Sequence, residues 1–393
     1  FVTIPCHDEP NLLATLRSLA ACQLPAEPVG VIVVVNCSED APPGVKARNE
    51  ATFLEARDWA STHSHKQLRF QIFNFDALPR KRAGVGLARK IAMDEAARQL
   101  EMAGNPAGVI ACLDADTLVQ PNYLCVLSNF FAQNPACQAA GIYYEHPLEG
   151  TDFQADVYDA IARYELHLRY YVWALRQAGL AAATQTVGSA MAVRADAYRA
   201  QGGMNSRQAG EDFYFLHKFT SLGGGAFREI TATTVLPSPR TSHRVPFGTG
   251  RAVGEMLAGH GFLTYSPLIF KDLASFLSNA DALLSGETNV RQLPLPTSVT
   301  SFLEQENFEE KLAEIRAHTA SPAAARKRFL RWFDPFRAMK FVHHARDLFY
   351  PNVPVEEAAA TWLAAQNQPL GKTDARSLLL IFRQMDAGLS VEG

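Results

Sequence analysis

Two carboxylates, Asp114 and Asp116, follow an apolar run in the stretch CLDADTLVQPNYL, residues 112–124. The run predicts a buried strand, and in an open parallel sheet ligands lie at the carboxyl ends of the strands. Two like charges there repel each other unless a cation lies between or beside them, and hard divalent cations take oxygen ligands of this kind. The pair therefore predicts a Mg²⁺ or Mn²⁺ site. A turn in which Asp116 caps the following helix is the structural alternative.

Polar side chains also follow the two earlier predicted strands. Residues 5–9 (Pro-Cys-His-Asp-Glu) come after the first strand, and residues 36–40 (Asn-Cys-Ser-Glu-Asp) come after the second. A helix cap or a turn explains each cluster taken alone. Because parallel strands end at the same edge of a sheet, three such clusters together favour one ligand site.

A basic segment precedes a predicted helix in the stretch PRKRAGVGLARK, residues 79–90. It contains two glycines and the basic residues Arg80, Lys81, Arg82, Arg89 and Lys90. A helix N-terminus and basic side chains both suit a pyrophosphate, whereas a solvated basic helix end is the structural alternative. Neither a G-x-G-x-x-G nor a G-K-[ST] motif accompanies these glycines, so they form no Rossmann or Walker fingerprint.

The elements that position these residues alternate between strands and helices in the first half of the chain, which is typical of βαβ units and a mostly parallel sheet. We expect strands over residues 1–5, 30–36, 68–75, 108–114 and 139–145, and helices over 11–22, 47–62, 87–102 and 121–133. An aromatic-rich helical stretch follows residue 151 and runs to about residue 180. Beyond about residue 253 the chain is largely helical, with breaks at RQLPLPT (291–297) and near HTASPAA.

Length and composition narrow the class of protein. The 393 residues allow two or three domains, or one large α/β domain with a helical extension. A net charge of -3 gives no reason to expect nucleic-acid binding. Every uninterrupted apolar stretch is shorter than the ~18 residues that a transmembrane helix needs. The chain opens inside a strand, so we expect that a residue or more is missing upstream.

All six cysteines lie before residue 140 and none has C-x-x-C spacing. This pattern favours buried free thiols in a reducing compartment over disulfides or a metal site. We therefore expect a cytoplasmic protein.

As a set, several stretches resemble the inverting family 2 glycosyltransferases of the GT-A fold. They occur in the family's order over about residues 1–250: VTIPCHDEPNLLATLRSL, VVVNCSEDA, RAGVGLARKIAMDEA, CLDADT, VGSAMAVRADAY with its GGMN turn, and AGEDFYFLHK. The resemblance implies an α/β fold with a mostly parallel sheet flanked by helices. It also implies a catalytic domain over 1–253, with a Rossmann-like nucleotide-sugar-binding half (1–145) and an acceptor half (146–253). Residues 254–393 then form a helical C-terminal region.

The same resemblance implies a metal-dependent transfer of a sugar from a nucleotide diphosphate sugar to an acceptor hydroxyl. Donor-binding roles fall on Pro5, Asp8, Glu9, Asn36, Ser38, Arg82, Arg89, Asp114 and Arg251. Mn²⁺ or Mg²⁺ would be held by Asp116 with Asp114 and His243, and would neutralise charge on the leaving diphosphate. Asp212 would be the general base that takes the acceptor's proton, and Glu211 would orient acceptor or metal. Alternatively, both acidic residues simply begin a helix.

The chain departs from the family pattern in two places. Many relatives carry two aspartates where this chain has Val35-Asn36, so the nucleotide base stays open, with a mild preference for UDP over GDP. The Q-x-x-R-W motif of processive synthases is absent, which favours a single transfer.

The role of the C-terminal region and the kind of activity each have more than one interpretation. The basic and aromatic stretch 326–350 predicts either peripheral contact with anionic lipid or packing of the helical region. The competing functions are a catalytically silent nucleotide-sugar-binding scaffold and a sugar nucleotidyltransferase. The latter is disfavoured because its Gly-rich signature is missing after the first strand.

Overall fold

A computed structural model describes residues 1–180, 182–207, 210–242 and 248–388. Within it the chain divides into two compact units. Unit 1 comprises Phe1–Tyr158 and Thr186–Gly254, and unit 2 comprises Asp159–Gln185 and Glu255–Gly393. The long helix α5 (Ala155–Gln177) passes from the first unit into the second.

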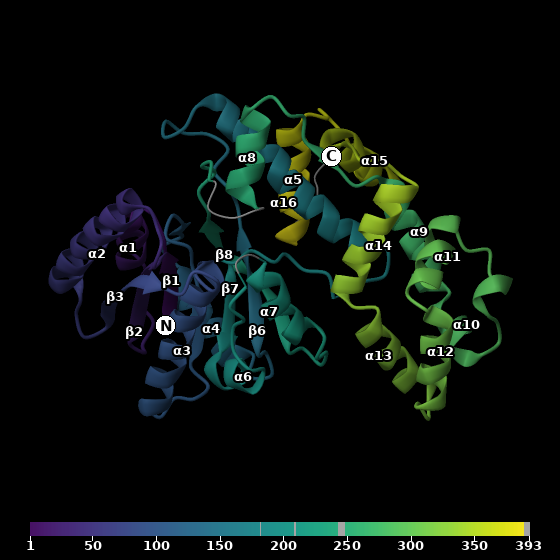
Figure 1. Ribbon diagram of the computed structural model, residues 1–393, viewed down its shortest axis with the longest axis horizontal. Helices are drawn as coiled ribbons and strands as arrows, with labels where there is room; N and C mark the ends of the chain where they lie inside the picture. Colours follow the sequence, from purple (N-terminus) through teal and green to yellow (C-terminus); the bar gives the residue numbers. More distant parts are fainter. Residues whose placement is uncertain (181, 208–209, 243–247, 389–393) are drawn as a thin grey trace. The chain divides into compact units, whose positions relative to one another are not determined.

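Unit 1 is built on one sheet (Figure 1). Within the described residues its eight strands have the order β3-β2-β1-β4-β7-β6-β8-β5. The strands are β1 (Val2–Cys6), β2 (Val29–Ser38), β3 (Leu68–Leu78), β4 (Val109–Cys112), β5 (Leu118–Val119), β6 (Ala139–Tyr144), β7 (Met191–Arg194) and β8 (Phe227–Leu236). β3, β2, β1 and β4 run parallel to one another, and β6 runs parallel to β8. β7 is antiparallel to β4 and β6, and β5 is antiparallel to β8. The predicted ends of β1, β2 and β4 therefore lie at one edge of the sheet.

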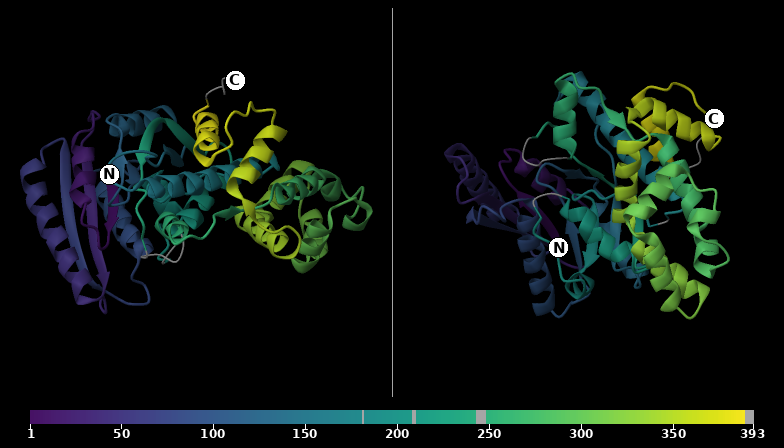
Figure 2. Two further views of the ribbon diagram at one scale, coloured as in Figure 1. Left: turned by 90° about the horizontal axis from the view of Figure 1, so that it is seen from above. Right: turned by 45° about the vertical axis from the view of Figure 1, so that its right-hand side comes forward.

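Helices cover both faces of this sheet (Figures 1 and 2). The helices α1 (Leu12–Ala20), α2 (Pro43–His63) and α4 (Tyr123–Gln133) share one hydrophobic core with it, and α3 (Val85–Met102), α6 (Ala195–Ala200) and α7 (Glu211–Thr220) share another. In β2, Val31 and Val33 belong to the first core, and Ile32 and Val34 belong to the second. A strand that is buried on both faces needs apolar residues at every position. The predicted α/β fold, mostly parallel and flanked by helices, is confirmed.

In the part of unit 2 that the structure describes, the regular elements are helices and one short antiparallel pair of strands, β9 (Leu263–Thr264) and β10 (Val353–Pro354). Its helices follow α8 (Thr249–Leu257): α9 (Pro267–Ser278), α10 (Ala280–Ser285), α11 (Thr297–Gln305), α12 (Phe308–Ala317), α13 (Pro322–Trp332), α14 (Pro335–Leu348), α15 (Val355–Ala365) and α16 (Ala375–Asp386). The predicted breaks fall before α11, where a 3₁₀ turn covers Val290–Gln292, and between α12 and α13. The prediction of a largely helical C-terminal region is confirmed.

The stretch 326–350 forms most of α13 and α14, and its aromatic rings pack inside unit 2. Phe329 and Phe333 lie against Phe276, with ring centroids 5.8 and 5.3 Å apart, and Phe341 lies 5.4 Å from Phe302. These phenylalanines are buried, so packing accounts for them. Membrane contact through this stretch stays a prediction.

None of the helices that the structure describes is both long enough and apolar enough to cross a membrane.

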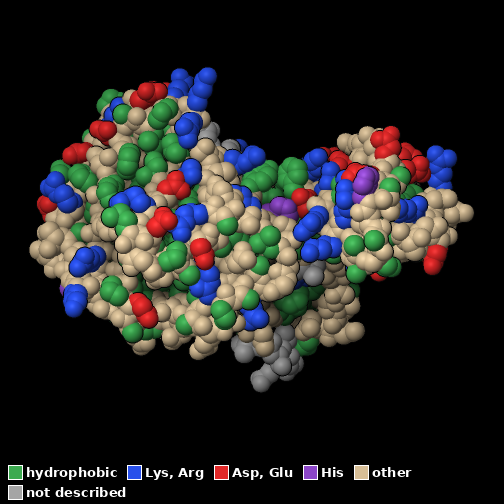
Figure 3. Space-filling view, turned by 90° about the horizontal axis from the view of Figure 1, so that it is seen from below, with side chains coloured by type: hydrophobic (Ala, Val, Ile, Leu, Met, Phe, Trp, Pro, Cys, Tyr) green, Lys and Arg blue, Asp and Glu red, His purple; other side chains and the backbone are tan. Residues whose placement is uncertain are grey.

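On the face shown in Figure 3, basic and acidic side chains are interspersed. This distribution accords with the small net charge of the chain.

All six cysteines are free, as predicted, and five of them are buried. Burial raises the pKa of the Cys112 thiol and raises that of Cys22 to about 11. These two thiols are therefore protonated at neutral pH and act as small apolar residues of the core.

A buried ion network joins α5 to α16 inside unit 2. Glu165 is fully buried and accepts hydrogen bonds from Arg169 and Arg383, each at 2.8 Å. Arg169 also pairs with Asp386, whose other oxygen accepts a hydrogen bond from the indole N–H of Trp173 at 2.7 Å. Each of these buried charges thus has a partner of opposite sign, which fixes the C-terminal helix against α5.

We expect Glu165→Gln to lower the free energy of unfolding of unit 2 by about 3 kcal/mol, because two buried guanidinium groups would lose a carboxylate partner. The matched control is Glu356→Gln, which removes a partly exposed partner of Arg163, a residue of the same helix α5. The control should cost less than about 1 kcal/mol. Urea denaturation followed by tryptophan fluorescence measures both, and equal losses would contradict a buried network.

Candidate active site

The turn after β4 presents the two aspartates predicted to bind metal. The hydroxyl of Thr15, on α1, donates to the carbonyl of Ala115 at 2.9 Å and so holds the turn between them. The Asp116 side chain is 24% exposed and pairs with an arginine. Helix α4 begins after Asn122 and receives no side-chain cap there. The alternative in which Asp116 caps this helix is therefore wrong.

Arg89, on the first turns of α3, is the buried centre of the site. Its Nη2 lies 2.9 Å from Asp114 Oδ1 and its Nε lies 3.2 Å from Glu211 Oε1. The guanidinium also donates to the carbonyl of Gly188, and its side chain is only 2% exposed. Although burial opposes its charge, the two carboxylates hold the pKa of Arg89 above its usual value. Arg89 thus joins the end of β4 to the start of α7.

Gly188 is a glycine because Arg89 fills the space beside it. A Cβ at this position would lie 2.8 Å from Nη2 and 2.9 Å from Nη1 of Arg89. Contacts this short require the guanidinium to move, and Arg89 is held by carboxylates on two other elements. Any larger residue at position 188 would therefore disturb the contact between Arg89 and its partners.

Glu211 and Asp212 form the first turn of α7, as the structural alternative for them also expected. Glu211 is buried, whereas Asp212 is partly exposed and accepts a hydrogen bond from the N–H of Phe213 at 2.7 Å. Burial raises the pKa of the Asp212 carboxyl to about 7, the charge of Glu211 adds to this rise, and Arg89 opposes it. Asp212 can therefore exchange a proton near neutral pH, as a general base must.

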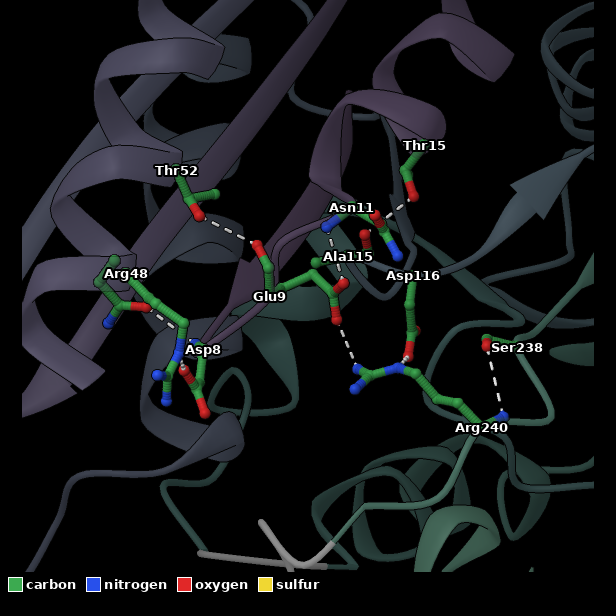
Figure 4. Close-up of polar contacts among 11 residues, drawn as sticks. Asp8, Glu9, Asn11, Thr15, Arg48, Thr52, Ala115, Asp116, Ser238 and Arg240 are labelled. Carbon is green, nitrogen blue, oxygen red and sulfur yellow. Dashed lines mark hydrogen bonds and ion pairs between the residues drawn. The ribbon is translucent and has the colours of Figure 1, made fainter. Parts of the chain in front are cut away.

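Arg240 joins the ends of β1 and β4 (Figure 4). Its Nη2 lies 2.5 Å from Glu9 Oε2, and its Nε lies 2.6 Å from Asp116 Oδ2. Glu9 is 1% exposed, and its other oxygen accepts a hydrogen bond from the N–H of Asn11 at 3.0 Å. No motif in the sequence singled out Arg240 as a site residue. The signal available was a basic residue just after the last long strand, in the same stretch as His243.

The ends of β1 and β2 are joined by Asn49, a residue of α2 that sequence analysis also missed. Its side chain accepts from the N–H of Asp8 at 2.8 Å and donates to the carbonyl of Asn36 at 2.9 Å. Asp8 has a positive φ of 53° and pairs with Arg48 at 2.5 Å. The carbonyl of Asn36 also lies 2.7 Å from Nδ1 of His7. The two predicted nucleotide-binding clusters are therefore neighbours.

The remaining predicted residues have different surroundings. Pro5 is buried in β1, and Ser38 ends β2. Arg82 is exposed on the loop before α3, and Arg251 is exposed on α8. His243 lies outside the described residues.

The carboxylates fit a divalent cation that shares its ligands with a substrate. No group of three or more His, Cys, Asp or Glu side chains in the described part of the chain is arranged to hold a metal. Asp114 and Asp116 supply oxygen donors, and Asp116 already contacts a positive guanidinium. Mg²⁺ in particular is commonly bound by one or two carboxylates together with substrate phosphates. The donor set suits this arrangement better than an all-protein cage.

Solved structures with a similar chain course include two bound complexes. The 1–349 fragment of TarS from S. aureus in complex with UDP-GlcNAc is 13% identical, with 100% of this chain and 92% of that chain covered and a TM-score of 0.39. The mannosyltransferase PcManGT from Pyrobaculum calidifontis in complex with GDP-Man and Mn²⁺ is 16% identical, with 98% and 86% covered and a TM-score of 0.35. Likeness at this level adds nothing to the assignment. A comparison with curated proteins finds no match.

Two family models match the chain. The model described as glycosyl transferase family 2 matches residues 1–174, and the one described as glycosyl transferase family group 2 matches residues 109–254. The two matched ranges together include Arg89 and Arg240 with the carboxylates that they contact, and the first turn of α7. The resemblance inferred from the sequence motifs is confirmed, and the scaffold and nucleotidyltransferase hypotheses lose their support. The chain belongs to glycosyl transferase family 2 and is a glycosyltransferase.

Proposed function

We propose that this enzyme transfers one sugar from a nucleotide diphosphate sugar to an acceptor hydroxyl, with inversion at the anomeric carbon. The observation that carries the proposal is the pair of contacts made by Arg89. They place Asp114, at the end of β4, and Glu211, at the start of α7, on one guanidinium. Carboxylates suited to the donor side and a base suited to the acceptor side are thereby held in a single cluster with Asp212.

The nucleotide is proposed to bind at the ends of β1 and β2. Asp8 and Asn36, which Asn49 holds together, would contact ribose and base with Pro5, Glu9 and Ser38. The exposed Arg82 and Arg251 would pair with the diphosphate. In domain terms, residues 1–145 bind the donor, residues 146–253 bind the acceptor, and residues 254–393 form the helical C-terminal region.

A divalent cation, Mn²⁺ or Mg²⁺, is proposed to be held by Asp116 with help from Asp114. When bound, it supplies positive charge to the diphosphate oxygens as the bond to the sugar breaks. Arg89 is assigned a role other than direct contact with the pyrophosphate. Because its guanidinium is buried and already contacts two carboxylates and a carbonyl, it positions those groups.

Asp212 is proposed to be the general base. It accepts the proton of the acceptor hydroxyl while that oxygen forms its bond to the anomeric carbon, and the bond from that carbon to the diphosphate oxygen breaks on the opposite face. Its raised pKa makes the carboxylate a better proton acceptor than an ordinary aspartate. Glu211, ionically paired with Arg89, keeps the first turn of α7 in place for this step.

Donor binding is tested by the melting temperature of the full chain with a panel of nucleoside diphosphates and nucleotide sugars, with and without Mn²⁺ or Mg²⁺. We expect a metal-dependent rise for one base, equivalent to about 2.7 kcal/mol at one hundred times Kd. Asp116→Ala should lose this rise, because the cation loses its main ligand. Asp58→Ala, which removes a carboxylate that is 73% exposed on α2, is the control and should retain it. An equal rise in Asp116→Ala would refute the metal site.

Asp212→Asn should lower kcat by about 10²- to 10⁴-fold while leaving the affinity for the donor unchanged, because only proton removal is lost. The matched control is Asp196→Asn. Asp196 also lies in the first turn of a helix and also accepts from the next N–H, at 2.6 Å, but it is exposed. Steady-state turnover and donor titration separate the two effects. If Asp212→Asn turned over substrate as fast as the wild type, Asp212 would not be the general base, and its carboxylate would only stabilise the start of α7.

The pH dependence of kcat/KM should show an acid limb near pH 7. A base must be deprotonated, so activity falls as the pH drops through the pKa of Asp212, which is raised to about 7. Below that pH we expect about a tenfold loss per unit, whereas an unshifted aspartate would keep the rate constant down to about pH 4. Measuring kcat/KM from pH 5 to 9 decides between these profiles.

A further inference from the structure

Arg240 contacts two carboxylates of unequal burial. Glu9 is 1% exposed, and it accepts from the guanidinium and from the N–H of Asn11. Asp116 is 24% exposed, so water and ions have access to it. Removing the guanidinium from Glu9 would take a cation away from a carboxylate that water cannot reach, whereas removing it from Asp116 returns that carboxylate to partial hydration. The contact with Asp116 is therefore the more easily broken of the two.

A divalent cation and the guanidinium compete for the same carboxylate. Arg240 Nε lies 2.6 Å from Asp116 Oδ2, the carboxylate to which the proposed function assigns the metal. If both cations remained in contact with Asp116, two positive groups would lie within a few ångströms in a partly buried site. Like charges at such separations repel each other, more strongly in a partly buried site than in bulk water. The two cations therefore compete for Asp116.

We propose that Arg240 is the resident counter-ion of Asp116: its guanidinium holds the carboxylate while no divalent cation is bound, and cation binding releases Nε from Asp116 while Nη2 stays on Glu9. This inference rests on the proposed metal-dependent function. The contact between Arg240 and Asp116 lowers the affinity of the protein for the divalent cation, because only the fraction of molecules in which Asp116 is released can bind the cation. Arg240 is thus a positioning residue that tunes metal affinity.

A second consequence links metal to donor. Once Nε is released, its N–H is available to an anionic acceptor, and a diphosphate oxygen is such an acceptor. A nucleoside diphosphate would then stabilise the released conformer and raise the affinity for the metal, and by reciprocity the metal would raise the affinity for the nucleotide. Without Arg240 this part of the coupling disappears.

The test is a Mn²⁺ titration of the full chain, followed by the electron paramagnetic resonance signal of free Mn²⁺. Arg240→Gln should bind Mn²⁺ roughly tenfold more tightly than the wild type without nucleotide. The matched control is Arg228→Gln, at the other end of β8, whose guanidinium contacts the side-chain oxygen of Asn134 at 2.8 Å. This control should keep the wild-type Kd. Adding UDP should tighten Mn²⁺ binding by a larger factor in the wild type than in Arg240→Gln.

A second variant controls for misfolding of Arg240→Gln, which takes the guanidinium away from the buried carboxylate of Glu9. The double variant Glu9→Gln/Arg240→Gln removes both charges. It should also bind Mn²⁺ more tightly than the wild type. If Mn²⁺ binding depends on Asp116 but neither variant gains affinity, the counter-ion role is overturned and the metal site stands. If Asp116→Ala binds Mn²⁺ as the wild type does, the metal site itself is overturned, and the counter-ion role with it.

Discussion

The burial of one guanidinium constrains the whole catalytic unit. Arg89 is charged and almost inaccessible to water. Its guanidinium therefore needs carboxylates or carbonyl oxygens close by to replace the water that it loses on burial. Those partners come from the turn after β4, from the start of α7 and from the backbone before β7, three segments far apart in sequence. The helix that carries Arg89 also packs tightly, because a Cβ on Gly86 would lie 2.1 Å from the carbonyl oxygen of Arg207. Glycine at position 86 thus allows the helix of Arg89 to pack closely, and glycine at position 188 leaves room for the Arg89 guanidinium.

The site as a whole carries more negative than positive charge. Around two guanidinium groups, those of Arg89 and Arg240, it collects five carboxylates: Glu9, Asp114, Asp116, Glu211 and Asp212. The excess helps to raise the pKa of Asp212, together with its burial. By linkage, the native state binds this proton more tightly than the unfolded state does. Ionised Asp212 therefore lowers stability as the pH rises from about 4 to about 7, and the full loss applies above that range. A base that is useful near neutral pH is for that reason a destabilising one.

The sequence predicted those parts of the fold whose cause is local. The uninterrupted apolar run 30–36 follows from burial of β2 on both faces, and each strand-end cluster follows from its own strand. The strand β5 was missed because two residues, Leu118–Val119, are too few to show a period of two. Arg240 was missed for the opposite reason. Its partner Glu9 is 231 residues away, and only the order of the strands brings the two together.

The two arginines of the site differ in burial, and this difference decides how easily each can release a carboxylate partner. Arg89 is 2% exposed, lies within a regular helix and contacts groups on three other segments, so releasing any one partner leaves a buried charge. Arg240 is 23% exposed and lies on an irregular segment after β8, and one of its two carboxylates is open to water. Breaking that contact exposes both charges to solvent instead of stranding them in the core. The same residue type therefore acts as a fixed support in one place and as an exchangeable counter-ion in the other, and burial decides which.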